Sequence, residues 1–180
     1  MNIREIDWRL SSVRQIISAI SHGLAANEQS FHEGGDIDDA CEYHDDLCGI
    51  AFVAAQAYIT ATVSDAKAIR GPRSPIGKVE LLKIGNPIVA DTKLTRMELC
   101  DAMANYYKHR DEWPTDWKDC KKFAKITTEL LHTAGFKQND EYLCTTVATL
   151  LFGNVQIDSL ARLVDMLSSW RASIIANARS

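Results

Sequence analysis

The feature that most constrains this chain is an apolar run over residues 47–63, in which thirteen of seventeen residues are apolar. These residues occur all round a helix rather than on one side, and a helix that is apolar on every side is a buried one. The run belongs to a helical pattern that begins among the acidic residues at 36–39 and continues to about residue 69. We therefore predict a buried central helix, about 39–69, against which the other helices pack.

Helical spacing of apolar residues also dominates the rest of the chain. It predicts further helices at about 3–27, 95–113, 115–134, 139–152 and 158–174, and no alternating run predicts a strand. Thr95 and Glu98 have the spacing of a capping box, and Thr115 follows Pro114 as the cap of the next helix. That next helix is expected to place Phe123 on its inward side. The prediction is an all-α, single-domain bundle of five to six helices over residues 1–180.

One long connection interrupts the helical pattern at about residues 71–91. It is bounded by Gly71-Pro72 and by Gly85-Asn86-Pro87 and contains a short apolar run at 78–84 that is at most a turn of helix. Long connections are uncommon in small domains unless they have a role. We therefore expect this loop to cover a site or a partner surface.

The composition excludes several classes of protein. The chain has 180 residues, a net charge of −4 and 46% hydrophobic residues, which indicates a folded protein without overall attraction to nucleic acid or anionic membranes. Its most apolar segment is shorter than the roughly 20 residues of a membrane span, and residues 1–10 lack a signal-peptide core. Five scattered cysteines without a CxxC pair indicate reduced, buried thiols. These features predict a soluble cytoplasmic protein with no membrane partner.

The densest run of chemically capable side chains is the segment 104–114. Asn105 and His109 are four residues apart, so they lie on one helical face with Asp101 and Lys108. Asn105-Tyr106-Tyr107-Lys108-His109 resembles the Arg-Asn-x-x-x-His signature of HEPN domains, which are small helical bundles common in bacterial toxin–antitoxin and antiphage systems.

The resemblance implies a site shared by two subunits. In HEPN domains the arginine and histidine face a partner across a dimer and form a metal-independent ribonuclease, in which the 2′-hydroxyl of RNA attacks the neighbouring phosphate. By this resemblance His109 would take the acid/base role, which suits an imidazole, and Asn105 the polar position. The arginine position is Ala104 in this chain, and Arg110 lies about 100° around the helix from His109. Three interpretations of this face therefore stay open: a solvated polar face with His109 favoured by the helix dipole, a binding surface, and catalysis. Because the arginine is missing, catalysis is the least favoured of the three.

A second group of candidates is basic. Lys118, Lys121, Lys122 and Lys125 occupy the outward side of the helix predicted at 115–134 and, with Lys108 and Arg110, would form a local basic patch. The aromatic residues Tyr106, Trp113 and Trp117 offer stacking faces for unpaired bases. Because Tyr106 and Trp117 also fall on apolar stripes, core packing is the favoured interpretation, and RNA binding is the alternative.

A third group is acidic. Glu42, Asp45 and Asp46, together with Asp36, Asp38 and Asp39, would form an acidic patch at one end of the central helix. Such acids favour the positive end of a helix and also suit docking of a basic partner. Cys41, His44 and Cys48 follow helical spacing but lack an evident fourth ligand. We predict no metal site and no cofactor.

Three functional hypotheses follow. The first is a HEPN-like protein of toxin–antitoxin or antiphage-defence type that binds a protein, either a second copy of itself or a toxin or antitoxin. The second is a metal-independent ribonuclease that uses His109. The third is an immunity protein whose acidic face neutralises a basic toxin.

Overall fold

The computed structural model describes residues 3–71, 76–84, 89, 92–153 and 160–179. Within these residues the chain forms seven α-helices and three short 3₁₀ helices and has no strand. The predicted all-α bundle is therefore confirmed. The helix beyond the predicted five to six is the one-turn α3, Lys78–Leu82. It lies inside the connection predicted at 71–91, of which residues 72–75, 85–88 and 90–91 are outside the described part.

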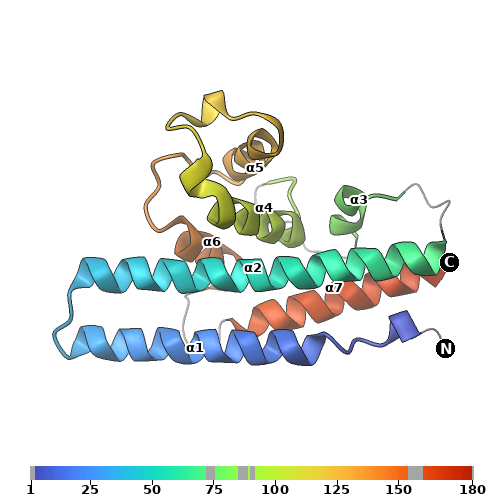
Figure 1. Ribbon diagram of the computed structural model, residues 1–180, viewed down its shortest axis with the longest axis horizontal. Helices are drawn as coiled ribbons and strands as arrows, with labels where there is room; N and C mark the ends of the chain where they lie inside the picture. The colour runs from blue at the N-terminus through green and yellow to red at the C-terminus, as the bar shows by residue number, and fades with distance from the viewer. Residues whose placement is uncertain (1–2, 72–75, 85–88, 90–91, 154–159, 180) are drawn as a thin grey trace.

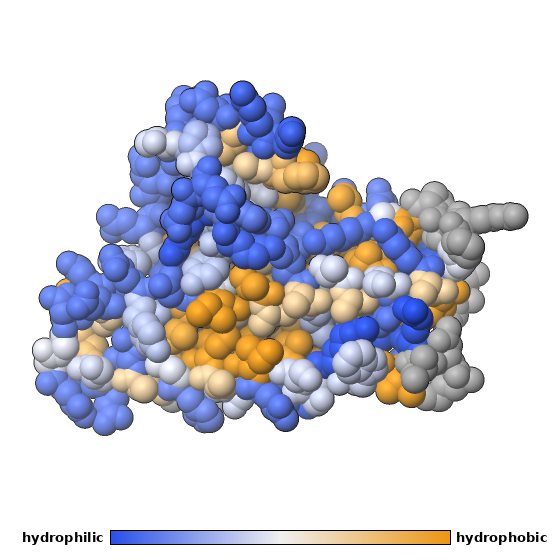
Figure 2. All heavy atoms as spheres, viewed as in Figure 1, coloured by the Kyte–Doolittle hydropathy of each residue, from blue (hydrophilic) through white to orange (hydrophobic). Residues whose placement is uncertain are grey.

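The predicted central helix is confirmed as α2, Ile37–Arg70. Figure 1 shows α1, Leu10–His32, and α7, Ala161–Arg179, on one side of α2, and α3, α4 and α5 on the other. Because α2 packs against α1, α4, α6 and α7, most of its surface is covered. The expectation of burial on every side is wrong for one stripe, where Ile50, Ala57 and Thr60 are exposed. Figure 2 shows apolar atoms on the open face shared by α1 and α2.

By length and composition alone, α2 is also apolar enough to cross a membrane, and it is the one such helix in the described residues. The core helix of a soluble protein passes the same test. In this structure 61% of its most apolar window is buried inside the bundle. The structure is therefore compatible with the soluble protein that the sequence predicts.

The start of α1 differs from the predicted helix at 3–27. Residues 3–5 form a 3₁₀ turn, and the α-helix begins at Leu10. The intervening segment is held by ion pairs to the core instead of by helical hydrogen bonds. Arg9 lies 2.6 Å from Asp65 of α2, and Asp65 in turn lies 3.0 Å from Arg171 of α7. Asp7 accepts a hydrogen bond from Tyr58 of α2.

Helix α1 continues past its predicted end at residue 27 to His32, so the turn before α2 is short. Gly34, at φ +105°, adopts the left-handed backbone that ends the helix. Asp36 then caps α2 by accepting hydrogen bonds from the backbone N–H of Asp38 and Asp39. The acidic start of α2 is thus explained by local helix capping.

Helix α4, Arg96–His109, begins as predicted, since Thr95 and Glu98 form the capping box. It ends before Pro114, because residues 110–112 tighten into a 3₁₀ turn, Arg110–Glu112. The predicted helix at 115–134 is divided into a 3₁₀ turn, Trp117–Asp119, and α5, Lys122–Thr133. The cap is Asp116, which accepts from the N–H of Lys118, and not Thr115. Gly135, at φ +93°, follows α5.

The last two helices are α6, Leu143–Phe152, and α7. The predicted start of α6 near residue 139 is wrong, because Asp140 closes a turn by accepting from the N–H of Lys137 at 2.7 Å. The predicted start of α7 near Asp158 lies outside the described residues. Helix α7 also anchors α3, since the indole N–H of Trp170 donates to the carbonyl of Leu81 at 3.0 Å.

The five cysteines are free thiols, and four of them are buried. Burial raises the pKa of Cys48 to about 12 and also raises the pKa of Cys100 and Cys144. The predicted burial of the thiols is confirmed for all but Cys41, which is partly exposed.

Candidate functional site

The polar face of α4 is not simply solvated, because it packs on Gln56 of α2. Gln56 donates its side-chain amide to Asp101 and to Asn105, each at 2.8 Å, and its carbonyl accepts from Lys108 at 2.5 Å. Lys78 of α3 completes the network at 2.6 Å from Asp101. Asp101 is buried as a result, and the hydrogen bonds hold α3 and α4 together over α2.

Lys108 and His109 are the exposed members of this face, and of these two only Lys108 binds Gln56. His109 is the last residue of α4, its side chain is 48% exposed, and its Nδ1 lies 3.3 Å from Glu112 Oε2. A histidine at a helix C-terminus is also favoured by the helix dipole when protonated. The structure thus brings Asn105 and His109 to one region, with Asn105 bound to Gln56 and His109 open to solvent.

Arg110 does not join His109. It turns toward α2, where its guanidinium lies 2.9 Å from Asp46 and 3.5 Å from Asp45 and is stacked over the ring of Tyr107 at 4.9 Å. Asp45 is buried and accepts from the backbone N–H of Thr145 at 2.8 Å, in the first turn of α6. Two of the predicted acidic binding residues therefore join α2 to α4 and α6.

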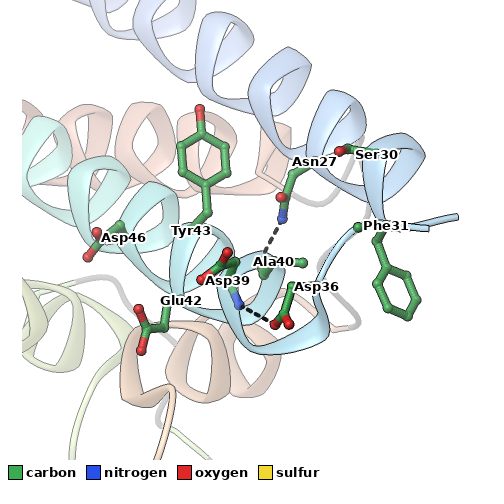
Figure 3. A pocket seen from close by; sticks show the side chains of 10 residues that line it. Asn27, Ser30, Phe31, Asp36, Asp39, Ala40, Glu42, Tyr43 and Asp46 are labelled. Atoms are coloured by element: carbon green, nitrogen blue, oxygen red, sulfur yellow. Dashed lines mark hydrogen bonds between the residues drawn. The ribbon is translucent and has the colours of Figure 1, made fainter. Parts of the chain in front are cut away.

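Three of the remaining acids, Asp36, Asp39 and Glu42, line a hollow at the turn between α1 and α2, together with Asp46 (Figure 3). Glu42 and Asp39 are exposed there, while Asp36 is engaged in capping α2. Asn27 of α1 donates to the carbonyl of Ala40 at 2.7 Å, which ties the two helices together. Across the described residues no group of three or more His, Cys, Asp or Glu is arranged to hold a metal ion, the helically spaced Cys41, His44 and Cys48 included.

The four lysines near α5 are all exposed but do not form one patch. Lys118 lies 3.9 Å from Asp116, and Lys125 lies 3.8 Å from Glu129. Lys121 and Lys122 have no ion pair within the described part of the chain and lie beside a groove. The basic residues are therefore divided between paired lysines on the outer surface and two unpaired ones at the groove.

This groove, of about 860 Å³, lies between α3, α4 and α5. Its wall from α4 includes Asp101, Asn105 and His109, and Trp113 follows them. The other walls carry mainly apolar side chains and lysines; they are lined by Lys78, Val79, Leu82, Lys83, Lys121, Lys122, Phe123, Ala124, Ile126, Thr127 and Leu130. The face predicted from the sequence thus forms one wall of a larger concave site.

Large apolar side chains are exposed around the groove. Phe123 is 84% exposed, Val79 60% and Ile126 55%. Figure 2 shows apolar atoms on the side of the α5 lobe that faces α3. Soluble proteins seldom expose several large apolar residues around one hollow unless something binds there.

The prediction that Phe123 points inward is wrong. Cys120 and Lys121 are extended, and Lys122 has a left-handed backbone at φ +51°, so α5 begins at a different rotation from the one that a continuous helix would have. Trp117 is buried as expected and contacts Tyr106 and Trp113 edge to face, with ring centroids 6.1 and 6.4 Å away. These aromatic residues pack on one another, and Phe123 is left exposed.

Comparisons with known proteins identify no protein that is similar to this chain. No family model matches it, and neither the curated proteins nor the solved structures include a significant match. The resemblance of the segment around Asn105 and His109 to HEPN domains therefore stays a prediction.

Proposed function

We propose that this protein is a binding module, and that the groove between α3, α4 and α5 holds a segment of a partner protein. The observation that supports this most directly is the exposure of Phe123, Ile126 and Val79 around that one groove. Helical domains often bind partners by burying apolar side chains in such a groove. The groove also includes His109 and Asn105, the residues with HEPN-like spacing.

Burial of these three side chains would supply a useful part of the binding free energy. Complete burial of one large apolar side chain contributes about 1.5–3 kcal/mol before the entropy cost of association. The walls are held in place without a partner, since Trp170 anchors α3 and Gln56 anchors α4. A preformed site of this kind loses less free energy to ordering when it binds.

The biological setting that we propose follows the resemblance of the Asn105–His109 segment. It is a cytoplasmic HEPN-like protein of toxin–antitoxin or antiphage-defence type, with a toxin, an antitoxin or a second copy of the chain as partner. The all-helical bundle is compatible with this setting.

The proposed function is tested by crosslinking in cells. A photoreactive phenylalanine analogue at position 123 should yield one discrete adduct, whereas the same analogue at Phe31, which is 38% exposed at the far end of α1, should not. Ile126→Asp should abolish the adduct while leaving the helical circular dichroism unchanged, because Ile126 is exposed. Identical adduct patterns from positions 123 and 31 would contradict a binding role for the groove.

A ribonuclease remains the second candidate, because His109 is open to solvent at the groove and has a carboxylate 3.3 Å away. The test is incubation of single-stranded RNA with the purified protein in chelator. Cleavage that His109→Ala abolishes and Lys118→Ala preserves would support this activity. Cleavage that survives His109→Ala would contradict the assignment of this activity to His109.

A further inference from the structure

We infer that the segment bound by the groove is an acidic amphipathic helix of the partner protein. This inference rests on the proposed function and specifies the chemistry of what is bound. It is carried by the charges around the groove and by the arrangement of apolar residues along α5.

Two of the three carboxylates that line the groove have a lysine beside them. Asp101 lies 2.6 Å from Lys78, and Glu98 lies 3.9 Å from Lys83. The third, Glu112, is exposed and lies 3.3 Å from His109, which carries a charge only when it is protonated. Because Asp101 and Glu98 are balanced within the protein, they add little negative potential to the groove.

Lys121 and Lys122 are the two groove lysines that have no carboxylate within ion-pair distance in the part of the chain described. Both are exposed, and they come directly before Phe123. The lining has four lysines against three carboxylates, so it is locally positive in a chain of net charge −4. A partner that places carboxylates beside Lys121 and Lys122 while covering Phe123 matches both the charge and the polarity of this edge.

The apolar residues of α5 favour a helical partner. Phe123, Ile126 and Leu130 follow one another at three- and four-residue steps, so they form a single ridge along one side of the groove. Val79 stands on the α3 side. A helix with apolar residues at the same steps packs its own ridge beside this one, with its acidic side turned toward the lysines.

The same observations disfavour RNA as the occupant. Binding of unpaired bases relies on exposed aromatic faces, and Trp113 packs edge to face against Tyr106 and Trp117, with centroids 5.6 and 6.4 Å away. The groove exposes aliphatic Val79 and Ile126 beside a single highly exposed aromatic ring, Phe123.

The experiment uses three fluorescent helical peptides with identical apolar positions at i, i+3, i+4 and i+7. Their polar positions are filled with Glu, with Gln or with Lys. Fluorescence anisotropy on the full chain should show the Glu peptide binding about tenfold more tightly than the Lys peptide at low salt, with the difference shrinking at high salt.

Matched charge reversals identify the lysines. Lys121→Glu/Lys122→Glu should remove or invert the preference for the Glu peptide. Lys118→Glu/Lys125→Glu changes the charge equally at two exposed positions outside the groove and should preserve it. Phe123→Ser should weaken binding of all three peptides together.

The outcomes separate the two proposals. If the Gln or Lys peptide binds as tightly as the Glu peptide and still requires Phe123, the groove binds proteins and the acidic helix is wrong. If none of the peptides binds, both the acidic helix and the protein-binding groove are contradicted. A single-stranded RNA oligonucleotide that displaces the Glu peptide and requires Lys121 and Lys122 would likewise overturn the inference in favour of RNA.

Discussion

Gln56 of α2 and Asn105 of α4 are joined by a 2.8 Å hydrogen bond, although 49 residues separate them in the chain. This bond places the polar face of α4 against α2, although the spacing of its residues is typical of an exposed site. Asp101 and Lys108 bind the same amide group. His109, at the groove, is the residue of this face that does not bind Gln56.

Replacement of Gln56 by Leu should destabilise the fold. The side-chain oxygens of Asp101 and Asn105, which accept from the Gln56 amide, would lose these hydrogen bonds in a largely buried environment. We expect a decrease of about 1–3 kcal/mol in the free energy of unfolding. Urea unfolding followed by circular dichroism measures it. Gln15→Ala, at an exposed position of α1, is the control and should stay within about 0.5 kcal/mol of the parent. An equal effect of both substitutions would show that the Gln56 network is not stabilising.

Gly49→Ala should be destabilising through the crossing of α2 and α4. A Cβ at this position would overlap the ring of Tyr107, and that ring is held by the Arg110 guanidinium 4.9 Å from its centroid. Overpacking of this kind costs about 1–3 kcal/mol, despite the better helix propensity of Ala. The matched double variant Gly49→Ala/Tyr107→Ala should recover part of the loss in urea unfolding. No recovery would mean that the cost does not arise at Tyr107.

Asp65→Asn should be among the most damaging single substitutions in the chain. The side chains of Asp65 and Arg171 are only 3% and 4% exposed, and Arg9 binds the same carboxylate. Removal of the Asp65 charge leaves the buried guanidinium of Arg171 with Asp7, 3.6 Å away, as its remaining carboxylate. Breaking a buried pair in this way costs about 3–5 kcal/mol. Thermal unfolding of Asp65→Asn compared with Asp165→Asn, an exposed control on α7, measures this difference. Similar midpoints for the two variants would refute a central role for the ion cluster.

Stability should fall as the solution is acidified below about pH 6.5, and His44 should contribute to that fall. Burial lowers the pKa of His44 below its ordinary value of 6.5, and the carboxylates of Asp45 and Glu28 oppose part of the shift. Between the folded pKa and 6.5 the unfolded chain binds more protons, so acid favours unfolding. In His44→Gln the loss of unfolding free energy between pH 8 and pH 5 should be smaller. Gln15→Ala, at an exposed position of α1, introduces and removes no titratable group and should keep the parent's pH dependence.

Thiol reactivity should single out Cys41. It is the one cysteine that is partly exposed, and burial raises the pKa of Cys48 to about 12. At pH 8 a thiol reagent should modify one cysteine per native chain rapidly and all five after unfolding. Cys41→Ser should remove the fast phase. Two or more fast thiols would show that the core opens more readily than the structure indicates.

Sequence patterns predicted the features that depend on neighbours along the chain. The apolar run at 47–63 predicted the buried part of α2, and Thr95 with Glu98 predicted the start of α4. Both signals arise within one or two helical turns, where a residue meets others three or four positions away. The same local logic places the end of the helix predicted at 115–134 within one residue of the end of α5 at Thr133.

Tertiary structure decided what those helices expose. The helical pattern around Phe123 predicts one continuous helix. In the structure the extended residues Cys120 and Lys121 change the rotation at which α5 begins, and Phe123 therefore points outward. The network of Gln56 and the ion cluster of Asp65 with Arg171 join residues 45 to 106 positions apart. The spacing of residues along the sequence does not predict such distant pairs, because they form only when packing brings the helices together. The apolar pattern therefore determined the helices and the all-α class, and the packing of α3, α4 and α5 decided which residues form the groove.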